Sequence, residues 1–399
     1  MMPSKRTLYK HRRMMLPRFR DAVDRTGQSF LPGASLAPWS SRLPGRLPAK
    51  FAGVVLAFFA CVDFTSVAHA QSGEPSTALI SSRAVALNPE TGKVYAVDTR
   101  RNAVLVFDPR TQSVSSVRVG AGPIAIATNA AINRIYVANF EGGSVSVIDG
   151  TNDSVLATLG VGPRPYVVAV NPATNRIYVS NTFSNLITVI DGATNSTTTV
   201  KAGSADAIGV DSRLDKVYLL GYEDTNLIVL NRVPLVVGKI PVGSHAWSMA
   251  SNETTGTLYV TRVGSAELVI VDEVAGLVTT VPTGAFPCGV AVNPVTNTVY
   301  VANHGDDTVT VIDGARRALI ATVKVGQSPQ AVAVDAKRNR VYVANSHSDD
   351  VTVIDGVRNS VLKTLHAGRN PYALAVDPNS GQLYVASYGE PALAAVDAR

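Results

Sequence analysis

The sequence predicts an all-β fold, a β-propeller of four-stranded blades, and three observations carry this prediction. A tyrosine recurs every 40 to 42 residues, at Tyr95, Tyr136, Tyr178, Tyr218, Tyr259, Tyr300, Tyr342 and Tyr384. An acid or amide follows each tyrosine by 13 residues, at Asp108, Asp149, Asp191, Asn231, Asp272, Asp313, Asp355 and Asp397. Each repeat holds short runs of strand-forming residues between turn residues. Repetition of such four-strand units is typical of propeller blades.

The strands of one repeat can be placed by their composition. Residues 331–334 and 373–376 alternate small and large apolar side chains, which predicts an innermost strand packed between neighbouring blades. Residues 340–344, 308–312 and 361–365 are rich in Val, Ile, Thr and Tyr and supply the second, third and outer strands. Asn171-Pro172 and Asp191-Gly192 are typical of tight turns, because Asn, Asp and Gly tolerate the backbone that such turns need.

The number of blades follows from the chain length after residue 70. Residues 71–399 number 329, which corresponds to eight units of about 41 residues. The last unit ends just after its third strand, so we expect residues 75–80 to supply the outer strand of the eighth blade. Closure of the ring by the two ends of the chain would remove the exposed edges of an open sheet.

Residues 1–70 have the composition of a basic leader with a secretory signal peptide. They hold 11 of the 36 Lys and Arg and 3 of the 30 Asp and Glu of the chain. Residues 51–62 are apolar, and Ala68-His69-Ala70 is a small-x-small triplet suited to cleavage before Gln71. A helix of that apolar run would be about 18 Å long, too short for a hydrocarbon core of about 30 Å. We expect removal of 1–70, no transmembrane segment after cleavage, and a periplasmic or extracellular domain over 71–399.

The positive net charge belongs to the leader rather than to the repeats. The chain carries +6 in total, but residues 71–399 hold 25 basic and 27 acidic side chains and are close to neutral. Sequence-independent affinity for nucleic acid needs many Lys and Arg against phosphates. The composition therefore argues against a nucleic-acid partner.

The repeat motif resembles that of a known family. Tyr-Val-Ala-Asn followed by Val-Thr-Val-Ile-Asp-Gly, as at 342–356, is similar to the YVTN-repeat family of exported β-propellers, and the resemblance covers nearly all of 82–399. It implies export and a propeller, usually of seven blades, so seven blades is the alternative to the count of eight. Residues 201–281 depart from the motif. The family implies no single activity, and a scaffold motif transfers fold rather than function.

A binding surface is predicted where the repeats vary. Antiparallel order places the loop before each innermost strand and the loop between the second and third strands on one face. At the channel mouth on this face, the variable positions carry aromatic and polar side chains, which suit recognition of peptides, sugars or flat ligands. The candidate binding residues are Arg164, Tyr166, Asp206, His245, Trp247, Phe286, Gln330 and Tyr372. The second loop adds Phe140, Tyr222, His304, His347 and Tyr388.

These residues indicate a binding or interaction module, without a cofactor, that recognises a protein, peptide or glycan as a monomer. Catalysis is not favoured, because the chain has no Cys-x-x-Cys-His, His-Glu-x-x-His, Gly-x-Ser-x-Gly or Walker sequence. A lactonase-like or other hydrolytic propeller using Asp206 and His245 remains an alternative, as does an accessory subunit of a periplasmic redox system. His304 and His347 lie near aspartates, but no ligand spacing recurs, so no metal site is predicted.

Overall fold

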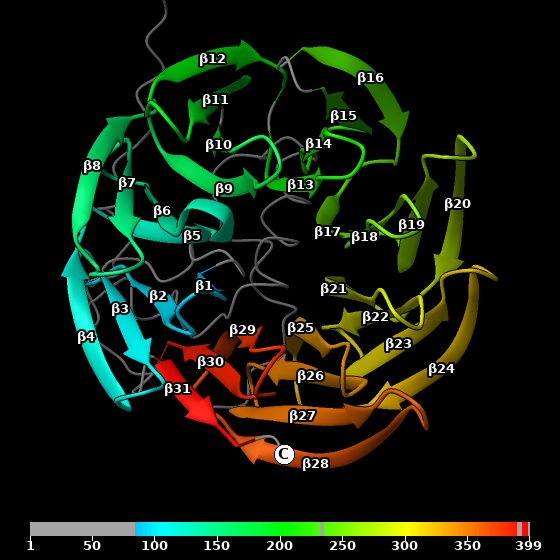
Figure 1. The fold of residues 1–399 in the computed structure, drawn as a ribbon. Helices are drawn as coiled ribbons and strands as arrows, with labels where there is room; N and C mark the ends of the chain where they lie inside the picture. The colour runs from blue at the N-terminus through cyan, green and yellow to red at the C-terminus, as the bar shows by residue number, and fades with distance from the viewer. Residues whose placement is uncertain (1–83, 183, 204, 232–234, 389–392, 398–399) are drawn as a thin grey trace, which may run out of the picture. The chain divides into compact units, whose positions relative to one another are not determined.

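Eight β-sheets succeed one another around a ring in a computed structural model of the chain (Figure 1). The structure describes residues 84–182, 184–203, 205–231, 235–388 and 393–397. All of these belong to one compact unit, Ala52–Arg399, and the other unit, Met1–Phe51, lies outside the described residues. The predicted signal peptide and the predicted closing strand at 75–80 also lie outside them.

The strands of each blade follow one another in the chain. Blades 1 to 3 consist of β1 (Val85–Leu87), β2 (Val94–Asp98), β3 (Ala103–Asp108), β4 (Ser113–Arg118), β5 (Pro123–Asn129), β6 (Arg134–Asn139), β7 (Ser144–Asp149), β8 (Val155–Gly160), β9 (Pro165–Asn171), β10 (Arg176–Asn181), β11 (Leu186–Asp191) and β12 (Thr197–Lys201). Blades 4 and 5 consist of β13 (Ala207–Asp211), β14 (Lys216–Leu220), β15 (Asn226–Leu230), β16 (Val236–Pro241), β17 (Ala246–Asn252), β18 (Thr257–Arg262), β19 (Glu267–Asp272) and β20 (Leu277–Pro282).

Blades 6 to 8 complete the ring. They consist of β21 (Pro287–Asn293), β22 (Thr298–Asn303), β23 (Thr308–Asp313), β24 (Ala318–Lys324), β25 (Pro329–Asp335), β26 (Arg340–Asn345), β27 (Asp350–Asp355), β28 (Ser360–His366), β29 (Pro371–Val376), β30 (Leu383–Ser387) and β31 (Leu393–Val396). One 3₁₀ turn, η4 (Ala130–Ile132), lies between β5 and β6. Seven sheets have four antiparallel strands, and the eighth has three among the described residues. The predicted all-β propeller and its count of eight blades are confirmed.

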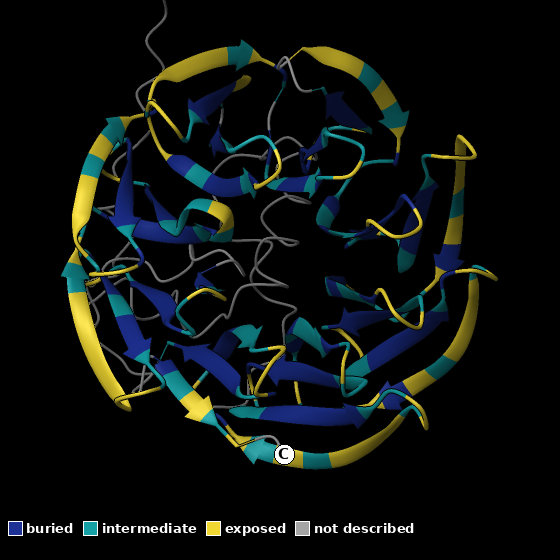
Figure 2. Ribbon diagram, in the orientation of Figure 1, coloured by how far each residue is buried: buried dark blue, intermediate teal, exposed yellow. Residues whose placement is uncertain are grey.

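Adjacent blades share their hydrophobic core. Each innermost strand contacts the innermost strand of the next blade, and β29 contacts β1. The repeated tyrosines are fully buried in these interfaces, and between blades 6 and 7 Tyr300 and Val309 pack with Val341 and Val343. Figure 2 shows buried second and third strands behind exposed outer strands such as β4, β8 and β12. Burial of apolar surface between blades therefore holds the ring together.

The recurrent motif residues have structural roles. The asparagine that ends the second strand ties it to the third, because Asn303 Nδ2 donates to Thr308 Oγ1 at 2.9 Å and to Thr310 Oγ1 at 2.8 Å. The aspartate that ends the third strand caps a turn, because Asp191 Oδ1 accepts the backbone N–H groups of Ala193 and Thr194, each at 3.0 Å. These backbone hydrogen bonds are the main cause of the lowered pKa of the Asp191 carboxyl. The motif thus accounts for the scaffold and leaves function to the variable loops.

Amide contacts link neighbouring blades on the face opposite the predicted site. Asn88 Nδ2 donates to Asn133 Oδ1 at 2.7 Å, and the same contact recurs in Asn129–Asn175, Asn171–Asp215, Asn252–Asn297 and Asn293–Asn339. The remaining three innermost strands end in an aspartate or are followed by one, and an aspartate side chain has no N–H to donate. The aligned position in the next blade is then a glycine with positive φ, in the pairs Asp211–Gly256, Asp335–Gly381 and Asp377–Gly92. In these three pairs, both the donating side-chain amide and its acceptor in the next blade are absent.

Candidate functional site

The loops of the predicted face are joined in pairs by backbone hydrogen bonds. We define the mouth face as the loops that enter each innermost strand together with the loops between second and third strands. The backbone N–H of Thr182 donates to the carbonyl of Arg164 at 2.9 Å, and that of His304 donates to the carbonyl of Phe286 at 3.0 Å. In these two blades a backbone hydrogen bond therefore ties one variable loop to the other.

Three aromatic side chains from blades 4 and 5 form a cluster on the mouth face. The Tyr222 ring lies 5.2 Å from the His245 ring and 6.1 Å from the Trp247 ring, both in edge-to-face geometry. Trp247 packs against a small core of Tyr222, Val263 and Cys288. The Tyr222 hydroxyl is buried without a hydrogen-bond partner, although buried polar atoms are usually paired. Burial raises its pKa to about 12.

A carboxylate stands beside this cluster. Asp206 Oδ2 accepts the backbone N–H of Tyr222 at 2.7 Å. Burial raises the pKa of the Asp206 carboxyl, the hydrogen bond from Tyr222 opposes this shift, and the charges of Asp224 and Glu223 add to it. The Tyr166 hydroxyl has a pKa raised to about 12, mainly by burial and further by the charge of Asp206. Blades 3, 4 and 5 thus bring together an acid and several aromatic rings.

Other aromatic contacts extend around the mouth face. The rings of Tyr372 and Tyr388 are 4.5 Å apart in blade 8, and those of His304 and His347 are 6.3 Å apart across blades 6 and 7. The Arg164 guanidinium lies 6.0 Å from the centre of the Phe140 ring. These pairs lie in blades 2, 3, 6, 7 and 8, away from the Tyr222 cluster.

The residues that enter the innermost strands hold left-handed backbone. At the position two residues before the variable mouth residue, φ is +62° at Gly122 and +51° at Asn370, residues that suit this conformation, and +54° at Ser328. The same position carries Arg164 at +53°, His245 at +61° and Phe286 at +49°. Left-handed backbone costs an ordinary L-residue about 1–2 kcal/mol, and its recurrence in six blades makes it a feature of the repeated turn.

We expect Phe286→Gly to leave the free energy of unfolding unchanged or to raise it by about 1 kcal/mol. Glycine adopts the observed φ without strain, and the Phe286 side chain is 42% exposed and contributes little burial. Urea denaturation followed by circular dichroism measures the change. Thr322→Gly, at an exposed position of outer strand β24 outside the left-handed set, is the control and should lose about 0.5–1 kcal/mol. Equal losses of unfolding free energy in both variants would contradict backbone strain at Phe286.

The structure places the predicted residues in different environments. Tyr166, Asp206, His245 and Trp247 lie around one region of the mouth face, together with Tyr222. Arg164 and Phe286 are exposed, and Gln330 is half-buried in blade 7. Tyr372 is only 6% exposed and belongs to the core between blades 8 and 1. Its substitution would test stability rather than binding.

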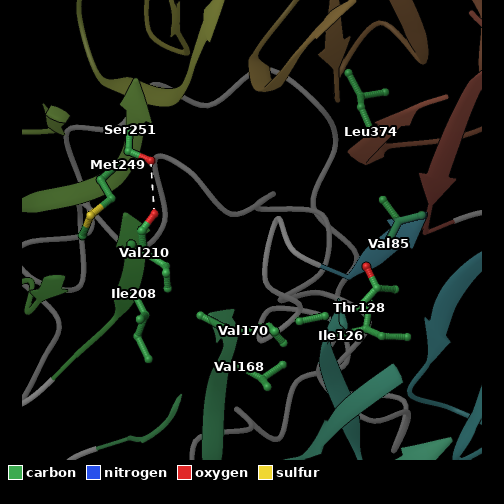
Figure 3. A pocket seen from close by; sticks show the side chains of 13 residues that line it. Val85, Ile126, Thr128, Val168, Val170, Ile208, Val210, Met249, Ser251 and Leu374 are labelled. Carbon is green, nitrogen blue, oxygen red and sulfur yellow. Dashed lines mark hydrogen bonds between the residues drawn. The ribbon is translucent and has the colours of Figure 1, made fainter. Parts of the chain in front are cut away.

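The central channel contains a cavity, which the pattern of variable loop residues did not indicate. The innermost strands of blades 1 to 5 and 8 surround a volume of about 470 Å³ lined by Ile126, Val168, Val170, Ile208, Met249 and Leu374, among others (Figure 3). Ser251 Oγ donates to the Val210 carbonyl at 3.4 Å on its wall. The innermost strands pack against neighbouring blades as predicted, but some of their apolar residues also border this cavity.

The histidines do not assemble a metal centre in the part of the chain that the structure describes. There, no group of three or more His, Cys, Asp or Glu residues could hold a metal ion. His304 Nδ1 is buried without a partner, and burial together with the neighbouring His347 lowers the pKa of His304 to about 4. His304 is therefore neutral at physiological pH. No helix within the described ranges is long and apolar enough to cross a membrane.

Comparisons with known proteins agree with the fold. Residues 273–389 match the family described as YNCE-like beta-propeller, and no curated protein matches the chain in sequence. Kuenenia stuttgartiensis hydrazine synthase is similar over 68% of this chain and 94% of that chain, with 20% identity and a TM-score of 0.56. Dihydro-heme d1 dehydrogenase NirN in complex with DHE is similar over 76% of this chain and 70% of that chain, with 13% identity and a TM-score of 0.64. At such identities these likenesses show the fold alone.

Proposed function

We propose that this chain is an exported binding module that recognises a protein, peptide or glycan through the mouth face. The observation that carries the proposal is the Tyr222 cluster, in which the rings of His245 and Trp247 pack edge-to-face on Tyr222 next to the Asp206 carboxyl. These residues stand at positions where the repeats vary, so the scaffold motif does not require them.

The arrangement supports binding more directly than catalysis. Asp206 and His245 were the residues of the hydrolytic alternative. His245 Nδ1 lies 3.2 Å from Ser244 Oγ, and the Asp206 carboxylate is hydrogen-bonded to the Tyr222 backbone. The contacts of the described residues show no hydrogen bond between Asp206 and His245, so no base–orienter pair is formed. Clustered aromatic rings are instead typical of recognition sites.

We expect Trp247→Ala and Tyr166→Ala to lose the partner that the wild-type protein captures from a periplasmic or secreted fraction by crosslinking. Removal of a central aromatic anchor costs about 2 kcal/mol or more, roughly a 30-fold loss of affinity. Val295→Ala is the matched control, because Val295 is 76% exposed in the turn between β21 and β22, on the opposite face.

Three further results would change the assignment. A partner retained by a folded Trp247→Ala variant would exclude the Tyr222 cluster as the binding site. A captured subunit with a visible chromophore would favour the role of an accessory subunit in a redox system. Ester or lactone hydrolysis lost in Asp206→Asn would favour the hydrolytic alternative.

A further inference from the structure

A second cavity lies between blades 4 and 5, whose outer strands are β16 and β20 (Figure 1). It has a volume of about 450 Å³, within the range of pockets that hold small ligands. Val229 and Ile240 of blade 4 and Val271 and Val278 of blade 5 supply apolar walls. The cavity is therefore suited to the apolar body of a small molecule.

The cavity is open at Gly238 of the outer strand β16. Gly238 pairs with Val229, and a Cβ on Gly238 would meet only Val229, at 3.9 Å. The outer strands of blades 1 to 3 and 5 to 7 carry a side chain at the aligned position, namely Ser115, Ala157, Thr198, Thr279, Ala321 and Lys363. Blade 4 thus lacks a side chain that these other blades place against the next blade.

An ion pair forms the polar part of the cavity wall. Glu273 Oε2 accepts hydrogen bonds from Lys216 Nζ at 2.7 Å and from the Tyr218 hydroxyl at 2.6 Å. The Glu273 side chain is only 3% exposed, whereas that of Lys216 is 35% exposed. Lys216 makes no other hydrogen bond or ion pair with a described residue. An ammonium has three N–H donors, so Lys216 retains donors for a ligand oxygen.

The charges around the cavity set the sign of its ligand. Glu273 pairs with Lys216, and Asp272 pairs with Arg317. Lys239 also lines the cavity, and it forms no ion pair with a described residue. Three cations against two acids give a local charge of +1. An anion is therefore favoured over a cation.

We propose that this cavity binds a small amphiphilic anion, with its apolar body between Val229, Ile240 and Val278 and its anionic group at Lys216. Lys216 begins β14 and Glu273 follows β19, at the ends of these strands remote from the mouth face. The cavity is thus a second site, and the inference goes beyond the proposed function.

Two fluorescent probes with the same ring system test the site. The first is 8-anilinonaphthalene-1-sulfonate, which is anionic, and the second is N-phenyl-1-naphthylamine, which lacks the sulfonate. Both become bright in apolar surroundings, so titration of the purified full chain gives their affinities. We expect saturable binding of the sulfonate probe, with about one molecule per cavity.

A cavity-filling variant locates the bound probe. Gly238→Phe should weaken binding of the sulfonate probe at least about tenfold, because the phenyl ring would occupy the space between the blades. Gly160→Phe is the matched control, since Gly160 is exposed in outer strand β8 and an added Cβ would meet no atom within 4 Å. This control should bind the probe as the wild type does. Circular dichroism of both variants confirms that they fold.

A charge-reversing variant tests the sign of the ligand without disturbing the core. Lys239→Glu should weaken binding of the sulfonate probe roughly fivefold and leave the affinity for the neutral probe within about twofold. Lys239 is exposed, so this variant keeps the test decisive even if Gly238→Phe fails to fold. Lys324→Glu, at an exposed position of outer strand β24 in blade 6, is the control and should change neither affinity.

Three results would overturn the inference. The first is the absence of saturable binding of the sulfonate probe to the wild-type protein. The second is unchanged binding in folded Gly238→Phe, which would place the probe elsewhere, for example in the central channel. The third is an equal effect of Lys239→Glu on both probes. None of them bears on partner capture through Trp247, so the proposed function stands or falls by its own experiment.

Discussion

Gly289→Ala is expected to lower the free energy of unfolding by about 2–3 kcal/mol, because two blades approach each other closely at this residue. A Cβ on Gly289 would lie 2.4 Å from the Gln330 carbonyl oxygen and 3.2 Å from the Ala331 Cα. Both atoms belong to the backbone of β25 in the next blade and cannot rotate away. The innermost strands of blades 6 and 7 would have to separate, which would loosen the core that they share.

Gly160→Ala is the matched control for this prediction. Gly160 is exposed at the end of β8, and an added Cβ would meet no atom within 4 Å. Its substitution should be neutral or stabilising by about 0.4–1 kcal/mol, because alanine reduces the entropy of the unfolded chain. Urea denaturation of the two variants and the wild type measures both effects. A Gly289→Ala variant as stable as Gly160→Ala would show that the blades tolerate separation.

Alkaline pH is expected to unfold the protein cooperatively, because the eight repeated tyrosines are buried as neutral phenols. Burial is the main cause of raised pKa values in all eight, and Tyr136, Tyr259 and Tyr300 reach about 12. In the unfolded chain a tyrosine loses its proton near pH 10. Above that pH the unfolded state releases protons that the folded state retains, so stability falls as pH rises from about 10 through about 12.

Two spectroscopic signals test this prediction in one titration. Tyrosinate absorbance reports ionisation, and far-ultraviolet circular dichroism reports loss of the strands. We expect most of the tyrosinate signal to develop together with the loss of circular dichroism, in one steep transition. Gradual ionisation of the core tyrosines near pH 10 with an unchanged dichroism spectrum would contradict their burial. Tyr136→Phe should weaken the dependence of stability on pH, because it removes one phenol whose pKa is raised by folding. The Tyr136 hydroxyl is buried without a hydrogen bond, so its removal breaks no hydrogen bond.

The scaffold could be predicted from the sequence because its determinants are local. Alternating apolar residues, turn residues such as Asp191 and Gly192, and the tyrosine repeat fix the strands and their number, and the 31 described strands follow that order. The amide contacts between blades required the structure. Only the observed pairing shows why Gly256 accompanies Asp211 while Asn297 accompanies Asn252.

The candidate site was predictable as a face but not as a set of contacts. Because successive antiparallel strands run in opposite directions, Tyr166, Asp206 and Trp247 are expected at the same end of their blades. Strand direction gives no distances. It could not show that Tyr222 contacts His245 and Trp247, or that Tyr372 is buried against a neighbouring blade. The left-handed backbone at Phe286 was also hidden, since phenylalanine does not indicate it.

The sequence by itself thus determined an all-β chain of eight repeats and the face on which its loops vary, because strand periodicity and turn chemistry act within a few residues. Tertiary structure alone decided which variable residues meet. Residues such as Tyr166, Asp206, Tyr222 and Trp247 come from three blades, and their contacts depend on how closely those blades pack around the ring. That packing is set by the whole core, including close approaches such as the one at Gly289, and not by any single repeat.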